Sequence, residues 1–131
     1  MFGVGDKPPF PPALKSMIAL LKLKMPTVPV SEDVPKVRPI TFMTVDRAGG
    51  DEIADGYINA PLFIFQCYAL DAGSAEELAE LLLSVLKSAQ FTRYGDVQFR
   101  YFTLAGGPKN FPDPDVPSHR RWQFSGTFTL N

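Results

Sequence analysis

The chain has 131 residues, a formal net charge of −1 and 45% hydrophobic residues, among them eleven phenylalanines. This length predicts a single domain, residues 1–131, that buries one core without disulfides or metals. The near-zero charge excludes an overall electrostatic field that would attract nucleic acid. No apolar run is long enough to cross a membrane, so no membrane partner is predicted. The one cysteine, Cys67, excludes an internal disulfide and favours a reducing compartment.

The N-terminal part is rich in proline, with eight of the thirteen prolines in the first 39 residues. Proline fixes φ and holds the residue before it extended, so residues 1–11 are predicted to form an extended arm. Pro12 can serve as the first residue of a helix over residues 12–24. A Pro-rich connection, residues 25–39, follows without a predicted element.

Two strands are expected next, because residues 40–46 alternate and residues 57–69 contain the most apolar run of the chain. Between them, residues 47–56 form a polar, Gly-rich loop that is too long for a two-residue hairpin turn. The second strand is apolar on both sides, which predicts burial on both faces. A helix can cover one face, and the other needs a second layer or a neighbouring subunit.

A second helix is predicted over residues 74–87. Ser74 and Glu77 have the spacing of a capping box, in which each side chain accepts from the other residue's backbone N–H. Apolar residues recur along one side of this segment at helical spacing. The turn Tyr94-Gly95-Asp96 then leads into a strand over residues 97–104.

The last stretch, residues 120–131, has the clearest period-2 pattern in the chain. An irregular loop, residues 108–119, precedes it. Side chains of a strand point alternately to opposite faces, so this pattern predicts a core strand with one buried and one wet face. The predicted buried face comprises Trp122, Phe124, Phe128 and Leu130.

These elements predict an α+β fold with the order α-β-β-α-β-β. Hairpin-like strand pairs with segregated helices favour a mainly antiparallel four-stranded sheet with both helices on one face, preceded by the Pro-rich arm.

No catalytic, cofactor or metal site is predicted. His119 is the only histidine, and no nucleophile motif surrounds Ser118 or any other serine. Cys67 lies in an apolar run, as a core thiol does. The acidic residues between Asp46 and Asp55 do not have the spacing of a calcium loop. The prediction is therefore a protein without enzymatic activity.

Three short motifs carry a family resemblance: Leu104-Ala-Gly-Gly-Pro108, Phe111-Pro-Asp-Pro-Asp115, and Arg121-Trp-Gln-Phe, which opens the last strand. Together with the order of the preceding elements, they resemble the tail-terminator proteins of long-tailed (siphovirus-type) phages, particularly those of actinobacterial hosts. The resemblance covers roughly residues 37–131. The Pro-rich segments in residues 1–12 and 25–39 depart from it.

The resemblance implies a structural virion protein that assembles in the host cytoplasm. It implies a ring, usually of six subunits, that caps the head-proximal end of the tail tube. Its partners would be other copies of itself, the major tail tube protein and the head-tail connector or stopper protein. Phage DNA would pass through the lumen without sequence readout.

Two alternatives stay open. One is another adaptor of the same particle, such as a head-completion protein or a tail-tube subunit. The other is a small enzyme or ligand-binding domain that uses the loops at residues 47–56 and 108–119.

Interface residues are predicted in the two long loops and in the two Pro-rich segments, because loops with fixed φ lose less entropy on docking. The candidates are Phe10, Arg47, Asp51, Glu52, Asp55, Phe111, Asp113, Asp115, His119 and Arg120.

Overall fold

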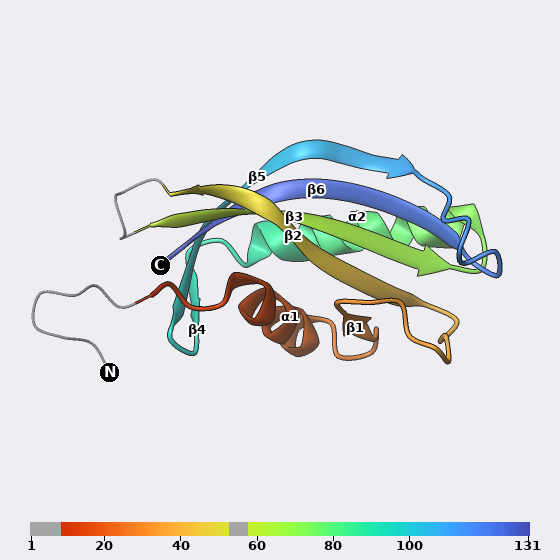
Figure 1. Cartoon of the computed structure of the whole chain (residues 1–131), viewed down its shortest axis with the longest axis horizontal. Helices are drawn as coiled ribbons and strands as arrows, with labels where there is room; N and C mark the ends of the chain where they lie inside the picture. The colour runs from red at the N-terminus through yellow and green to blue at the C-terminus, as the bar shows by residue number, and fades with distance from the viewer. Residues whose placement is uncertain (1–8, 53–57) are drawn as a thin grey trace, which may run out of the picture.

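A six-stranded curled sheet with two helices against one face forms the frame of the molecule (Figure 1). The computed structural model describes residues 9–52 and 58–131. The sheet has the order β1-β2-β3-β6-β5-β4, in which β1 runs parallel to β2 and all other pairs are antiparallel. The elements are α1 (Ala13–Lys24), β1 (Val30–Ser31), β2 (Phe42–Glu52), β3 (Asn59–Ala69), α2 (Ala72–Ser88), β4 (Thr92–Tyr94), β5 (Val97–Asn110) and β6 (Arg120–Leu130).

The predicted four-stranded antiparallel sheet was wrong. The chain forms one mixed sheet of six strands, with the element order α-β-β-β-α-β-β-β. The two missed strands, β1 and β4, have two and three residues. Such short segments hold too little alternation to give a period-2 signal. They form because a longer neighbouring strand supplies partners, as when the Met43 N–H donates to the Pro29 carbonyl at 2.9 Å.

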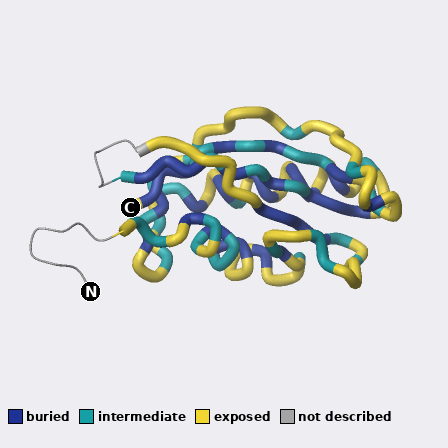
Figure 2. Tube along the Cα trace, in the orientation of Figure 1, coloured by how far each residue is buried: buried dark blue, intermediate teal, exposed yellow. Residues whose placement is uncertain are grey.

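The core lies between the sheet and the helices, where β3 and β6 are largely buried, whereas the second half of β2 and most of β5 are exposed (Figure 2). Residues directly opposite one another on paired strands share a face, and Val45, Phe65 and Phe124 stand in one such row across β2, β3 and β6. The rings of Phe65 and Phe124 stack with centroids 5.0 Å apart. The helices complete this core with Met17, Leu20, Leu21, Ala75, Leu78, Ala79, Leu82, Leu83 and Leu86.

The final strand has the expected alternation on its helix-facing side. Phe124, Phe128 and Leu130 are buried, and Trp122 packs half-buried against the same cluster. Each fully buried large side chain contributes roughly 1.5–3 kcal/mol. This face of β6 is therefore a main source of stability.

The capping box predicted from Ser74 and Glu77 is not the cap of α2. The helix begins at Ala72, and Asp71 is its N-cap: Asp71 Oδ1 accepts from the Ser74 N–H at 2.8 Å and Oδ2 accepts from the Ser74 hydroxyl at 2.9 Å. These hydrogen bonds lower the pKa of the Asp71 carboxyl. Aspartate caps at least as well as serine, so the helix starts two residues earlier than predicted.

Two strands end further along the chain than predicted. β5 passes the expected end at residue 104 and reaches Asn110, with register shifts around Gly106. β2 likewise runs into the predicted loop as far as Glu52, with a bulge between Arg47 and Gly50. Gly50 has φ 120°, and a Cβ there would overlap the backbone of Ala60 and Pro61. Glycine here bends a strand instead of ending it.

Gly126 lies under the ring of Phe102, and a Cβ at this position would overlap that ring. Gly126→Ala is expected to destabilise the protein by about 1–3 kcal/mol, because the aromatic ring has to leave its packed position. The measurement is the urea concentration at the unfolding midpoint.

Gly107→Ala is the matched control, because no atom lies within 4 Å of a Cβ built there. Equal midpoints for the two variants would contradict the close contact between Phe102 and β6.

Candidate interaction surface

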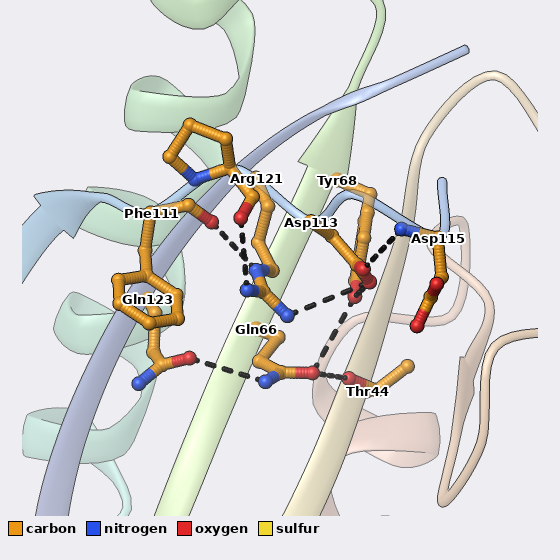
Figure 3. A network of polar contacts seen from close by, with 9 residues as sticks. Thr44, Gln66, Tyr68, Phe111, Asp113, Asp115, Arg121 and Gln123 are labelled. Atoms are coloured by element: carbon orange, nitrogen blue, oxygen red, sulfur yellow. Dashed lines mark hydrogen bonds and ion pairs between the residues drawn. The ribbon is translucent and has the colours of Figure 1, made fainter. Parts of the chain in front are cut away.

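The sheet face opposite the helices carries a row of hydrogen-bonded polar side chains at its middle. Thr44, Gln66 and Gln123 stand opposite one another on β2, β3 and β6. The Thr44 hydroxyl donates to Gln66 Oε1 at 2.8 Å, and Gln66 Nε2 donates to Gln123 Oε1 at 3.1 Å (Figure 3). This row links three strands without using any charge.

Next to this row, an ion pair joins the sheet to the loop that precedes β6. Arg121 Nη1 lies 3.5 Å from Asp113 Oδ2, and both side chains are largely buried. The same Asp113 oxygen accepts from the Tyr68 hydroxyl at 2.8 Å. Arg121 also donates from Nε to the Phe111 carbonyl at 2.6 Å and from Nη2 to the Pro112 carbonyl at 3.3 Å (Figure 3). One guanidinium thus holds three consecutive loop residues.

Phe111 is a large apolar side chain that this loop exposes to solvent, with an exposed fraction of 44%. The guanidinium of Arg121 lies 4.8 Å from its ring centroid, and Lys109 Nζ lies 5.1 Å from it. Cations at these distances are attracted to an aromatic ring. The ring therefore has a defined position while it stays accessible to a partner.

Burial controls the ionisation of two groups in β3. It raises the pKa of Tyr68 to about 12, and the hydrogen bond to Asp113 acts in the same direction, whereas Arg121 opposes it. The Tyr68 phenol therefore stays protonated at neutral pH and acts as a donor. Burial also raises the pKa of Cys67 to about 12. A thiol with this pKa is not a nucleophile at neutral pH.

His119 ties the end of the loop to the Pro-rich connection. Its Nε2 lies 2.8 Å from the Pro39 carbonyl oxygen, and its Nδ1 lies 2.8 Å from the Ser118 hydroxyl. A carbonyl oxygen only accepts, so Nε2 carries the hydrogen. The ring also packs edge-on against Phe42, which forms a small second core with Tyr68 and Val116. A backbone carbonyl stands where a catalytic triad would need a carboxylate.

The predicted interface residues do not form one site. Phe111, Asp113, Asp115 and His119 share the loop between β5 and β6, and Arg120 is the first residue of β6.

The other predicted residues lie elsewhere in the fold. Arg47 and Asp51 lie on β2, towards the opposite end of the sheet from the loop (Figure 1). Glu52 is the last residue of β2, and Asp55 lies outside the described residues. Phe10 is half-buried just before α1.

Sequence reasoning missed Tyr68 and Arg121, which fix this loop in place. It also missed Gln66, which hydrogen-bonds to Thr44 and Gln123 on the sheet. Gln66 and Tyr68 interrupt an apolar run at period-2 positions, which is a signal for a polar face. The alternation puts Arg121 on the side of β6 that was predicted to be wet, but Arg121 is buried. Nothing in the sequence shows that it folds back onto residues 111–113. The contact joins residues that a turn brings together, and turn geometry is not visible in the pattern.

Among residues 9–52 and 58–131, no cluster of three or more histidine, cysteine or acidic side chains could hold a metal ion. Within the same ranges, none of the helices has the length and hydropathy needed to cross a membrane. Comparison with protein-family models gives no match, and comparison with curated proteins gives none either.

Arg121→Gln is expected to destabilise the protein by about 2–4 kcal/mol, because it leaves Asp113 charged and largely buried without a partner. Arg120→Gln, at the neighbouring exposed position, is the matched control and should change stability by no more than about 0.5 kcal/mol. Urea denaturation of both variants measures the difference. Similar losses in the two variants would contradict the anchoring role of Arg121.

Tyr68 is expected to ionise near pH 12, whereas exposed tyrosines ionise near pH 10. Since its pKa in the folded state is the higher one, its contribution to stability is complete below pH 10 and is lost as the pH rises towards 12. Ultraviolet titration of the phenols, with the folded fraction followed by circular dichroism, measures this step.

Tyr68→Phe should lack the late ionisation step and should approach the wild type in stability above pH 10. Persistence of the late step in Tyr68→Phe would assign it to one of the other three tyrosines.

Proposed function

We propose that this chain is a structural subunit of a phage neck, namely a tail terminator that forms a ring on the head-proximal end of the tail tube. The ring would stop growth of the tube, offer a docking face to the head-tail connector, and let DNA pass. The resemblance of residues 104–130 to tail terminators is the starting point for this proposal.

The observation that carries the proposal is that the motif residues behind the resemblance contact one another. Phe111 and Asp113 come from one motif and Arg121 from another, and a buried ion pair, a carbonyl contact and a stacked ring join them. These residue types are therefore explained by the need to hold a loop rigid. A loop held in one conformation loses little entropy on docking, which suits a permanent assembly contact.

The distribution of the predicted interface residues supports a subunit that binds two different partners. One group lies in or next to the loop before β6. The other lies on the second half of β2, towards the opposite end of the sheet (Figure 1). Strands of eleven residues separate these ends by about 35 Å. A ring subunit between a tail tube and a connector needs contact surfaces at two opposed ends.

The test is to add the purified protein to growing tubes of the major tail tube protein and to record tube length and end structure by electron microscopy. The expected result is a ring on one end and an arrest of growth. A protein that stays monomeric at high concentration and does not bind tubes would contradict the proposal. Incorporation along the tube wall would instead favour a tail-tube subunit.

Phe111→Ala should weaken one docking contact of the ring, because it removes an accessible and positioned ring from the loop. Leu81→Ala is the matched control, since Leu81 is a similarly exposed apolar residue on α2. Both variants are compared for binding to tubes and to the connector. Equal binding of the two variants would exclude the loop before β6 from the interface.

A further inference from the structure

A groove runs along the outer side of α1, away from the core. Its first part has a volume of about 280 Å³ and lies between α1 and the turn from β4 to β5, with mostly apolar walls. A second hollow of about 320 Å³ continues along the same helix. The two parts share Lys15 and Ala19. The remaining lining includes Pro11, Tyr94 and Val97 in the first part and Ile18 in the second.

The chain has a segment whose sequence fits this groove. Residues 1–8 read Met-Phe-Gly-Val-Gly-Asp-Lys-Pro. In an extended chain, Phe2 and Val4 point to the same side, and the glycines beside them allow close approach to a helix. Eight extended residues reach about 26 Å, while a twelve-residue helix such as α1 is about 18 Å long. The segment can therefore follow α1 along its whole length.

Charge complementarity supports the same fit. The groove presents Lys15 and Lys22 along α1 and has an acidic residue at each end, Asp96 and Glu32. The segment carries one charge of each sign, at Asp6 and Lys7. An extended chain in the groove can thus place both of its charges near opposite ones.

The segment that occupies the groove has to come from another copy of the chain. Residues 9–12 lead directly into α1, and Pro11 itself forms one wall of the groove. Four of the five residues from Pro8 to Pro12 are prolines, and prolines with extended preceding residues oppose a tight reversal. A reversal within residues 1–8 would take up about four of them, and the other four would not follow α1 along its length.

We propose that residues 1–8 of one subunit lie in the α1 groove of the adjacent subunit. The arm and the groove are different surfaces, so this contact is heterologous, and repeated contacts of this kind form a ring when the rotation between subunits closes. The inference rests on the proposed function for the ring itself. Exchange of the arm between subunits is a separate claim and is tested separately.

The test uses two variants that each add one cysteine, Phe2→Cys and Ala19→Cys, which are mixed, assembled and oxidised. A covalent dimer on a non-reducing gel is expected only in the mixture. Cys67 is buried and should not react, so the wild type serves as the background. Phe2→Cys mixed with Lys87→Cys, in a hollow on the outer side of α2, is the matched control and should give no dimer above that background.

A chain that carries both Phe2→Cys and Ala19→Cys adds a second readout. Arm exchange predicts dimers and longer covalent ladders, whereas an arm folded onto its own subunit predicts only a compact, cross-linked monomer. A cross-linked monomer, or equal cross-linking to Lys87→Cys, would overturn the inference.

Native mass measurement on the same samples separates this inference from the proposed function. Rings that cap tubes but lack the Phe2–Ala19 cross-link would overturn arm exchange and leave the tail-terminator proposal standing. Cross-linked oligomers that never bind tubes would support arm exchange and contradict the tail-terminator role. A protein with neither cross-link nor tube binding would contradict both.

Discussion

The contact on which the exposed side of the structure depends is the pairing of Arg121 with Asp113. Arg121 is 8% exposed, and a buried guanidinium is tolerated only when its donors are satisfied. Here it meets a carboxylate and two loop carbonyls, and the carboxylate in turn accepts from Tyr68. The loop before β6 is held to the sheet by this set of contacts. Without them, Tyr68 and Phe42 would lose their cover.

The positions of the helices explain why the sheet needs the contact between Arg121 and Asp113. Both pack on one face of the sheet, so the other face receives no layer from the described chain. A purely apolar second face would be exposed, and the sheet instead carries Thr44, Gln66 and Gln123 in mutual hydrogen bonds. The end under the loop is apolar, and Ile64 adds a half-buried apolar side chain on the other side of the polar row. The sheet is thus closed on one side and partly closed on the other, and the remaining open polar area is available to water or to a neighbour.

The short edge strands β1 and β4 cover only a few residues of β2 and β5, and the open parts of β2 and β5 make pairing between subunits through strands unfavourable. On β2, the Arg47 N–H is already satisfied by the Asp46 side chain at 2.8 Å, next to a bulge. On β5, Pro108 offers no donor, and register shifts surround Gly106. Bulges and prolines are common means of blocking open strand edges. An assembly of this chain would therefore use loops, arms and helix surfaces, which agrees with a groove along α1.

The sequence by itself determined the features that depend on local periodicity: α1, the body of α2, the presence of the four long strands, and the buried side of β6. Burial of an apolar stripe needs only the right spacing, so these features can be recognised without knowing the partner. The tertiary structure decided the short strands β1 and β4, the cap at Asp71 and the bulges in β2 and β5. It also decided that Arg121 and Asp113 meet and that the predicted interface residues separate to different parts of the sheet. Each of these depends on which groups a turn or a neighbouring strand brings into range, and spacing along the chain does not encode that distance.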